Sequence, residues 1–340
     1  MANSQLLLTF AAAAAAGLLS GVMTAAFRPL LLRIALAKPN ARSSHRIPTP
    51  QGAGIAVVAA TLAAAAVFIA LVGTGDAGIP LAVFAATLFI AAVGFADDIR
   101  SIPVLPRLLL QGAAVAVVIL AAPESLRVVP VCPLWLERTL LLLAGLWFVN
   151  LVNFMDGLDL MTVAEIVPIT GTVVLLGWLS GLPASTTLVA AALFGAMLGF
   201  APFNRPVAKI FLGDVGSLPI GLLVGWCLLQ LAWHQQFAAA LLLPLYYLAD
   251  ATVTLLRRMA RREPFWAAHR SHFYQRATDN GFSVSRVVGE VFALNIVLAM
   301  LATGSAMASS ATISALLLVI GGIATALLMW RFSSRRPSPA

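Results

Sequence analysis

Charged residues are scarce in this sequence. Lys and Arg together number 21 and Asp and Glu 13, so that only 10% of the 340 residues are charged, whereas 61% are hydrophobic. Soluble domains contain about 25% charged residues, and the mean hydropathy here is +0.98. This composition excludes a pair of soluble domains and indicates a multi-pass membrane protein.

Cysteine is almost absent too, since only Cys132 and Cys227 occur and both lie in apolar surroundings. Two such residues exclude a disulfide framework and a cysteine-rich metal cluster. We do not expect a cleavable signal, because the first apolar run has no basic start and is followed by charged residues, as a first membrane span would be. The net charge of +8 predicts how the loops are oriented in a membrane rather than a nucleic-acid partner.

Long apolar stretches make up most of the chain. A membrane-spanning helix needs about 20 mostly apolar residues, and eleven stretches near that length are separated by Pro, Gly or charged residues. We therefore expect an all-α, polytopic integral membrane protein with about eleven transmembrane helices. Residues 1–335 would form a single transmembrane domain and 336–340 a short cytoplasmic tail. The expected spans lie near 5–27, 52–73, 80–96, 108–122, 136–152, 162–180, 185–201, 217–233, 237–256, 287–304 and 311–330.

The basic residues predict the orientation of these spans. If the N-terminus lies outside, 19 of the 21 Lys and Arg residues fall in inner segments, and only Arg127 and Arg138 fall outside. Basic residues concentrate on the cytoplasmic side of membrane proteins. The outer connections would be short and nearly uncharged, so we expect the polar chemistry of this protein to lie on the inner side.

Five acidic residues fall at the inner ends of predicted helices, in three different segments. Carboxylates at membrane depth are costly and are usually functional, and like charges gathered at one rim repel each other. A divalent cation would relieve that repulsion, and Mg²⁺ prefers carboxylate, water and phosphate oxygens. The sequence therefore predicts a composite site formed by Asp97, Asp98, Asp156, Asp159 and Asp214.

The stretch "NLVNFMDGLDLMT" at 150–162 is the most polar interruption of an apolar region. Asn150, Asn153, Asp156 and Asp159 follow one another at steps of three, which on a helix would form a polar stripe along one face. The alternative is a loop with an Asx turn. Because the stretch ends a span at the inner rim, we favour a role in the composite site.

Two further motifs carry acids at helix ends. In "FLGDVGSLPIG" (211–221), Asp214 stands between two glycines and Ser217 precedes a helix, whose free N–H groups suit a phosphate. The alternative is that either residue merely caps the helix. In "GFADDIRS" (94–101), paired carboxylates could hold a metal, or one could act as a base while the other shifts its pKa. The alternative there is a helix end facing solvent.

Two inner loops are basic. "HRIPTPQGAGIA" (45–56) begins with His45 and Arg46, which could meet phosphate, although an ordinary inner loop would look similar. "WAAHRSHFYQRA" (266–277) contains His269, Arg270 and His272. These form a poor zinc site, because no third or fourth ligand lies nearby. They fit the recognition of a diphosphate better, and the neighbouring aromatic residues suggest contact with the membrane interface.

Together these motifs resemble the polyprenyl-phosphate N-acetylhexosamine-1-phosphate transferases of glycosyltransferase family 4, which include the peptidoglycan translocase I. The resemblance runs from about residue 38 to residue 280. The motif at 268–277 is similar to that of the branch of the family that initiates O-antigen. Ala53 stands where the family often has glycine, and Leu160 replaces another glycine. The motifs are "IPTPQGAG" (47–54), "DD" (97–98), "NLVNFMDGLD" (150–159), "FLGDVGS" (211–217) and "AHRSHFYQRA" (268–277).

The resemblance implies a transferase domain with cytoplasmic catalytic loops. It would move an N-acetylated sugar-1-phosphate from a UDP-sugar to undecaprenyl phosphate and release UMP, in the first membrane step of O-antigen or another surface polysaccharide. Peptidoglycan lipid I synthesis is the alternative within the family. The protein would lie in a bacterial inner membrane, with a periplasmic N-terminus, and a homodimer is a further expectation.

The resemblance also implies roles for individual residues. Asp214 would bind Mg²⁺ (or Mn²⁺) together with Asn153 or Asp156. Asp97 or Asp98 would orient or deprotonate the lipid phosphate; an Asp acting as a covalent nucleophile is the alternative. Asp97, Asp98, Asp156 and Asp214 are thus the expected catalytic residues. The expected substrate-binding residues, with Phe211 stacking on uracil, are His45, Arg46, Asn150, Asn153, Asp159, Phe211, Ser217, His269, Arg270 and His272.

A secondary transporter is the main alternative from another class, because its composition and number of spans would be similar. Transporters, however, place ionisable groups near the bilayer midplane and show symmetry between their halves. Here the acids gather at one rim, and no matching pair of broken helices is evident. A CDP-alcohol transferase would need further Asp residues after an Ala-Arg pair, which "DGLDLMTVAEIV" lacks.

Overall fold

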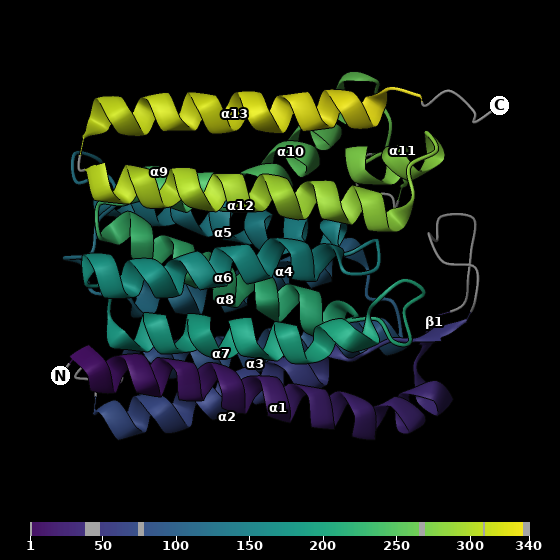
Figure 1. Cartoon of the computed structure of the whole chain (residues 1–340), viewed down its shortest axis with the longest axis horizontal. Helices are drawn as coiled ribbons and strands as arrows, with labels where there is room; N and C mark the ends of the chain where they lie inside the picture. The colour runs from purple at the N-terminus through teal and green to yellow at the C-terminus, as the bar shows by residue number, and fades with distance from the viewer. Residues whose placement is uncertain (1, 38–47, 74–77, 265–268, 309, 336–340) are drawn as a thin grey trace.

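The computed structural model shows a bundle of long helices that lie side by side with nearly parallel axes (Figure 1). It describes residues 2–37, 48–73, 78–264, 269–308 and 310–335. Ten helices in these ranges are long and apolar enough to cross a membrane. The all-α, polytopic membrane class predicted from composition is therefore confirmed.

The ten long helices are connected by short segments. Their bounds are α1 Ala2–Ile34, α2 Gly54–Val72, α3 Gly78–Ile99, α4 Val104–Ala121, α5 Leu134–Met155, α6 Met161–Ser180, α7 Ala184–Phe200, α8 Asp214–Trp233, α12 Val284–Ala308 and α13 Ala311–Ser333. Three shorter helices are α9 Phe237–Leu242, α10 Leu245–Ala260 and α11 Phe273–Asp279, and a 3₁₀ turn η1 covers Ala201–Phe203.

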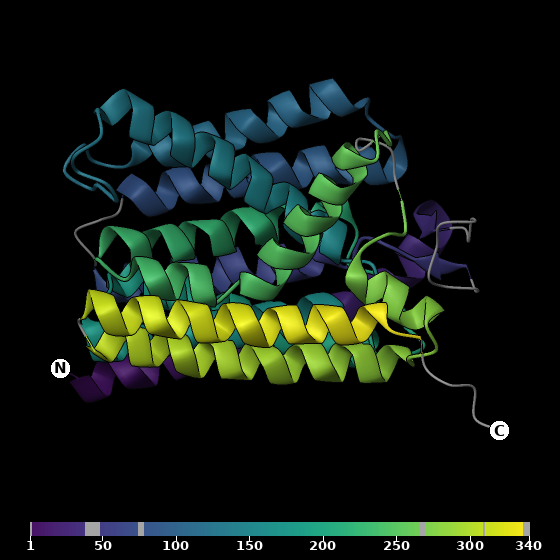
Figure 2. The same ribbon diagram turned by 90° about the horizontal axis from the view of Figure 1, so that it is seen from above.

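The predicted span at 237–256 is divided into two helices. α9 ends at Leu242 and α10 begins at Leu245, with Pro244 between them. Proline has no N–H to donate to the preceding turn, and its ring clashes with a continuing helix. α10 leaves the common direction and crosses the bundle obliquely (Figure 2). The prediction of about eleven spans thus corresponds to ten continuous helices and one broken one.

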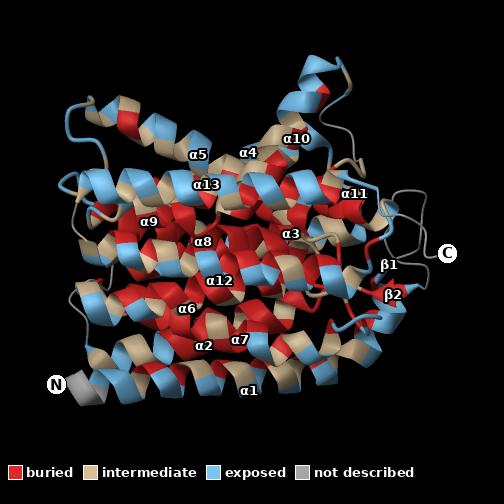
Figure 3. Cartoon of the chain, turned by 45° about the horizontal axis from the view of Figure 1, so that its top comes forward, coloured by how far each residue is buried: buried red, intermediate tan, exposed pale blue. Residues whose placement is uncertain are grey.

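α8 is the central helix of the bundle. Of its most apolar 18-residue stretch, 89% is buried inside the protein. The helix lies within the buried interior (Figure 3). It packs against α3, α5, α2 and α9. A helix that is apolar on all sides is expected in such a position, so the residues at its N-terminus are held by the most constrained part of the molecule.

Two glycines let neighbouring helices approach the start of α8 closely. A Cβ atom on Gly54 of α2 would lie 2.2 Å from the Cα atom of Gly216, and one on Gly94 of α3 would lie 2.3 Å from the carbonyl oxygen of Asp214. Small residues permit such backbone contact between membrane helices. The ends of α2, α3 and α8 therefore meet at one place.

A short antiparallel pair, β1 (Leu36–Ala37) and β2 (Thr49–Pro50), extends this meeting point. The backbone N–H of Phe211 donates to the carbonyl oxygen of Pro50 over 2.8 Å, and the N–H of Gly52 donates back to Phe211 over 3.1 Å. These bonds tie the Pro-Thr-Pro loop to the segment before Asp214. His45 and Arg46, like the tail at 336–340, lie outside the described residues.

The two arginines predicted on the outer side lie at the end of the bundle opposite the acids. α3 ends at the acidic pair, and α4 then crosses the bundle and ends at Ala121. Beyond it, Arg127 forms an ion pair with Glu137 over 2.7 Å, and Arg138 donates to the carbonyl oxygens of Ile119 and Pro123. The structure thus separates these arginines from the acidic motifs along the bundle axis.

Candidate active site

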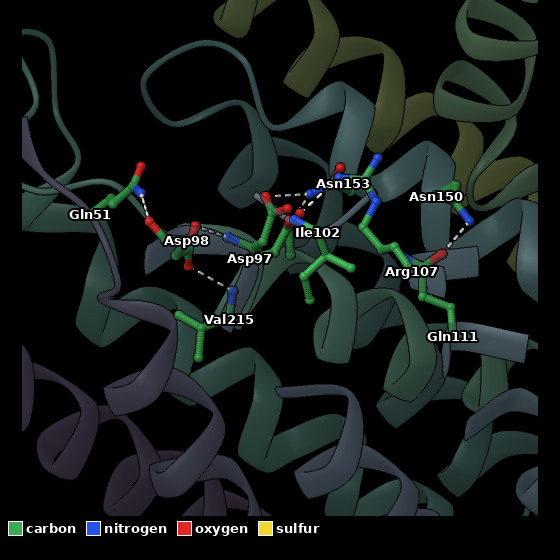
Figure 4. Close-up of polar contacts among 11 residues, drawn as sticks. Gln51, Asp97, Asp98, Ile102, Arg107, Gln111, Asn150, Asn153 and Val215 are labelled. Carbon is green, nitrogen blue, oxygen red and sulfur yellow. Dashed lines mark hydrogen bonds and ion pairs between the residues drawn. The ribbon is translucent and has the colours of Figure 1, made fainter. Parts of the chain in front are cut away.

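Asp97 at the end of α3 is held by the start of the next helix. Its Oδ2 accepts a hydrogen bond from Arg107 Nη1 of α4 over 2.7 Å, and its Oδ1 accepts one from the backbone N–H of Ile102 over 2.5 Å (Figure 4). The pair is largely buried, with side-chain exposures of 7% for Asp97 and 23% for Arg107. Arg107, which the sequence analysis did not single out, therefore brings a positive charge to the edge of the site.

Asp98 points in another direction and contacts the start of α8. Its Oδ1 accepts a hydrogen bond from the N–H of Asp214 and its Oδ2 one from the N–H of Val215, each over 3.0 Å (Figure 4). The first N–H groups of a helix have no partner within it, and a carboxylate there also interacts favourably with the helix dipole. Asp98 thus caps α8 from α3. In this structure both oxygens of Asp98 are used to hold the backbone at Asp214 in place.

Asp214 is the first residue of α8 and lies next to the Asn/Asp motif, which is the stretch 150–159. Its Oδ1 accepts a hydrogen bond from Asn153 Nδ2 over 2.8 Å, and the same amide nitrogen donates to Ser217 Oγ over 2.8 Å. The carboxyl groups of Asp97 and Asp214 also interact directly. Ser217 is fully buried, so this predicted substrate-binding residue lies behind Asn153. The structure brings Asp97, Asn153 and Asp214 together.

The predicted polar stripe of 150–159 is only partly helical. α5 ends at Met155, so Asn150 and Asn153 are on the helix whereas Asp156 and Asp159 lie beyond its end. Asn150 is buried and donates to Gln111 Oε1 over 2.8 Å (Figure 4), which directs it away from Asp214. The four side chains therefore do not share one helix face, and Asn150 supports the packing of α4 against α5.

Asp156 and Asp159 occupy the turn between α5 and α6. Burial raises the pKa of Asp156 to about 6; the charges of Asp98 and Asp159 act in the same direction, whereas the hydrogen bond from Thr162 lowers the pKa. Asp159 Oδ2 accepts a hydrogen bond from the N–H of Ala208 over 3.0 Å. This bond places the segment before Asp214 against the Asn/Asp motif, where the family resemblance implied a nucleotide site.

Asn204 strengthens the same contact. Its Oδ1 accepts from the N–H of Leu160 over 2.7 Å, and its Nδ2 donates to the carbonyl oxygen of Ile210 over 3.0 Å. Leu160 has a φ of 63°, a left-handed conformation that costs most residues about 1–2 kcal/mol. Glycine would adopt that conformation freely, and it often occupies this position in the family that the sequence resembles. Phe211 is held next to this contact by the backbone bonds to the Pro-Thr-Pro loop.

The two histidines of the basic loop that precedes α11, called the histidine loop below, lie side by side. The ring centroids of His269 and His272 are 4.9 Å apart, and His269 Nδ1 lies 2.8 Å from Ser271 Oγ. Burial lowers the pKa of His269 to about 4, and the charges of His272 and Arg258 act in the same direction. Arg270 forms an ion pair with Asp279 over 3.1 Å. His269 is therefore a neutral group at physiological pH.

This loop is fixed to the Asn/Asp motif by Tyr274. Its hydroxyl donates to the carbonyl oxygen of Phe154 over 3.0 Å, and a Cβ atom on Gly157 would lie 2.1 Å from the same hydroxyl. His269 and His272, far from Asp156 in sequence, thus belong to the same end of the bundle as the carboxylates. That is the placement predicted for the histidine loop.

The central cluster is chemically suited to a divalent cation. Among the described residues no three His, Cys, Asp or Glu side chains form a ready-made metal group. The carboxylates of Asp97 and Asp214 nevertheless adjoin, and Asn153 bonds to Asp214. Oxygen ligands with excess negative charge are the set that Mg²⁺ prefers, with water and substrate completing the shell. The side chains of Asp214 and Asn153 fit together, whereas the carboxylate of Asp156 accepts a hydrogen bond from Thr162 and only the backbone N–H of Asp156 contacts Asn153.

Comparison with known proteins finds similar sequences over part of this chain. Residues 80–232 match glycosyl transferase family 4, a range that includes the carboxylate cluster but not the histidine loop. The chain is 26% identical over 179 residues to a probable undecaprenyl-phosphate N-acetylglucosaminyl 1-phosphate transferase of Bacillus subtilis, which covers 50% of each chain. It is 32% identical over 108 residues to the phospho-N-acetylmuramoyl-pentapeptide-transferase of Enterococcus faecalis, 32% of this chain and 33% of that one. The matches thus span half or less of these relatives' length.

Proposed function

From its place in glycosyl transferase family 4, we propose that this membrane protein transfers an N-acetylated sugar-1-phosphate from a UDP-sugar to undecaprenyl phosphate and releases UMP. The observation that carries the proposal is the cluster of Asp97, Asn153 and Asp214 at one end of the bundle, with Arg107 at its edge. Phosphoryl transfer between two anions needs positioning and charge neutralisation. A carboxylate cluster that binds a divalent cation, with basic side chains beside it, can supply both.

In this proposal Asp214 and Asn153 would hold Mg²⁺, and a cation bound there would supply charge neutralisation for the donor diphosphate. Asp98 fixes the start of α8, and with it Asp214, through two backbone hydrogen bonds. Asp97 then faces the acceptor, whose phosphate also meets Arg107. A phosphate monoester has a second pKa of about 6, so Asp97 orients the attacking oxygen and little proton removal is required.

The uridine part of the donor is assigned to the contact between the Asn/Asp motif and the segment before α8. Asp159 and Phe211 lie on the two sides of that contact. The histidine loop, with His269 and Arg270, adjoins the same motif through Tyr274 and is assigned to the sugar and the diphosphate. Neutral His269 would donate or accept a hydrogen bond rather than contribute charge.

The prenyl chain of the acceptor is assigned to an apolar cavity of about 230 Å³ between α4, α5, α8, α9 and α10. Its lining includes Val115, Ala144, Leu222 and Leu248, and the break at Pro244 forms part of its wall. A larger cavity of about 500 Å³, lined by Gln5 and Trp178 among others, lies toward the opposite ends of α1, α6 and α7. We assign the chain to the smaller cavity because α4, α5 and α8 also carry Arg107, Asn153 and Asp214.

The sugar separates two candidate reactions. The histidine loop resembles the O-antigen-initiating branch, and the Bacillus subtilis relative supports a UDP-N-acetylhexosamine donor. Synthesis of peptidoglycan lipid I is the second candidate, because relatives such as that of Shouchella clausii, 40% identical over 87 residues, 26% of each chain, are named phospho-N-acetylmuramoyl-pentapeptide-transferases. We further propose a bacterial inner membrane, a periplasmic N-terminus, a cytoplasmic site and a homodimer.

The test is UMP release by the purified protein in detergent, with Mg²⁺, undecaprenyl phosphate and a panel of donors. The panel contains several UDP-N-acetylhexosamines and UDP-N-acetylmuramoyl-pentapeptide. We expect UMP from one N-acetylhexosamine donor, lost with EDTA and restored by Mg²⁺ or Mn²⁺. Asp214→Asn should abolish turnover while membrane insertion survives. UMP from the pentapeptide donor would select the second candidate. No UMP and no binding of any radiolabelled UDP-sugar would refute both.

A further inference from the structure

Asp250 of α10 is a fully buried carboxylate with five hydrogen-bond donors around it. Two donors come from its own helix, and three come from the histidine loop and the start of α11. A buried carboxylate is costly unless hydrogen bonds replace its water, and here they do so from two separate parts of the chain. The donors are Tyr246 Oη (3.1 Å), Thr254 Oγ1 (3.2 Å), His272 Nδ1 (3.2 Å), Phe273 N (3.0 Å) and Tyr274 N (3.1 Å).

The backbone bonds make Asp250 the cap of α11. His272 occupies the position before this helix and provides no side-chain cap of its own. The N–H groups of Phe273 and Tyr274 donate instead to the two oxygens of Asp250. The first N–H groups of a helix need such partners, and a negative charge is favourable there. The position of α11 is thus set from α10.

The side-chain bond fixes the ring of His272. Both oxygens of Asp250 already accept hydrogen bonds from four other donors, so the Nδ1 atom of His272 is assigned as the fifth donor and carries the proton. Nε2 is then the second nitrogen of a ring whose direction is held by a stack on Tyr274, with centroids 5.8 Å apart. His272 in turn lies beside His269. Asp250 therefore sets both the tautomer and the orientation of this pair.

The effect of Asp250 extends to the carboxylate motif. Tyr274, whose N–H binds Asp250, donates its hydroxyl to the carbonyl oxygen of Phe154, two residues before Asp156. α10, α11 and the end of α5 are linked in this order. Asp250 itself does not contact the Asn/Asp motif. A substitution of Asp250 would nevertheless let the histidine loop move relative to that motif, because Tyr274 connects the two.

We infer that Asp250 is a positioning residue that holds the histidine loop in place for the UDP-sugar donor. The inference rests on the proposed function. This role of Asp250 predicts an effect on donor binding alone, because Asp250 acts through His272 and α11 and not through the cavity assigned to the prenyl chain. Loss of one charge-assisted contact is often worth tenfold in binding or more.

The experiment compares Asp250→Asn with the matched control Tyr246→Phe in the full-length protein. The control removes one bond to the same carboxylate from its own helix and keeps the three bonds to the loop. We expect Asp250→Asn to raise KM for the donor about tenfold, with KM for undecaprenyl phosphate unchanged. Amide hydrogen exchange over 269–279 should also increase. Tyr246→Phe should resemble the wild type in all three measurements.

Two further variants make the test decisive. In a His272→Ala background, Asp250→Asn should raise the donor KM less than it does in the wild type, because the two residues act together. If Asp250→Asn does not fold, Tyr274→Phe leaves the carboxylate satisfied and breaks the link to Phe154. An unchanged donor KM in Tyr274→Phe would refute the route through α11.

The outcomes also separate this inference from the proposed function. Wild-type turnover with an unchanged donor KM in Asp250→Asn would overturn the role of Asp250 alone. Equal increases in both KM values, with the same loss of thermal stability, would show a general structural role and overturn it as well. A wild-type protein that releases no UMP from any donor would overturn the proposed function, and the role of Asp250 with it.

Discussion

At the scale of single residues, the two neighbouring aspartates of α3 have different tasks. Asp97 contacts Arg107, whereas both oxygens of Asp98 bind the N-terminus of α8. The sequence predicted the pair as a functional unit but not this division, because it depends on the close approach of α3 and α8. That approach is permitted by Gly94, whose role is visible only once the helices are placed.

Asp250 is the clearest site residue that the sequence analysis missed. It lies inside the predicted span 237–256, and an ionisable residue in a membrane span is a functional candidate by default. That signal was present and was outweighed by the acids at the predicted rim. Arg107, just before the predicted span 108–122, was counted as an inner charge and not as a partner of Asp97. Pairing partners cannot be predicted from one sequence without the packing of the helices.

Asp156 predicts a pH dependence of stability. Because burial raises its pKa from 3.8 to about 6, the folded protein holds this proton more tightly than the unfolded chain does. The contribution of Asp156 to the free energy of unfolding is therefore largest below pH ~4, falls as the pH rises from about 4 to 6, and stays lower above that, by at most about 3 kcal/mol. In EDTA, Asp156→Asn should raise the thermal midpoint at pH 8 and leave it unchanged at pH 4. Equal midpoint shifts at both pH values would contradict this account.

At the scale of helices, the close contact of α3 with α8 has a measurable consequence. In Gly94→Ala the new Cβ atom would meet the carbonyl oxygen of Asp214 at 2.3 Å, so the start of α8 must shift. We expect a loss of about 1–3 kcal/mol in stability and at least a tenfold loss of UMP release.

The matched control is Gly112→Ala in α4, where nothing lies within 4 Å of the added methyl group. There the better helix propensity of alanine should leave stability equal or raise it by about 1 kcal/mol. Thermal unfolding in detergent and initial rates of both variants check the comparison. Equal behaviour of the two variants would mean that the α3–α8 contact does not constrain Asp214.

The cavity assigned to the prenyl chain can be tested on α5. Ala144 and its neighbour Leu143 are both exposed, but only Ala144 lines this cavity. Ala144→Trp should fill the space and raise KM for undecaprenyl phosphate about tenfold, while KM for the donor stays the same. Leu143→Trp should leave both KM values unchanged. If both variants impair the acceptor equally, or neither does, the chain binds elsewhere.

Most long helices could be predicted because about 20 consecutive apolar residues have few alternatives in a membrane. The break in 237–256 was not predicted, although Pro244 was present, because proline also occurs inside intact helices here, as Pro168 and Pro219 show. The end of α5 at Met155 shortened the predicted stripe of 150–159. Periodicity of three in a polar stretch does not distinguish a helix from a turn that follows one.

At the scale of the whole molecule, the basic residues and the acidic motifs predict one orientation in the membrane. Cys132 lies in the α4–α5 connection, at the end opposite the acids, and is partly exposed, whereas Cys227 in α8 is buried. In intact cells a membrane-impermeant thiol reagent should label the wild type and not Cys132→Ser. Arg100→Cys in a Cys132→Ser background should react only in inverted vesicles. The reverse pattern would invert the proposed topology.

The cavity beside the broken helix has a consequence for how the reaction is measured. It is bounded by Ala144 and Leu248 on the lateral flank of the bundle rather than at either end. An acceptor seated there arrives by diffusion in the plane of the bilayer, so its encounter rate depends on its mole fraction among the lipids and not on its concentration in the vessel. Adding inert lipid at constant acceptor would then slow the enzyme by surface dilution, while the soluble donor would be unaffected.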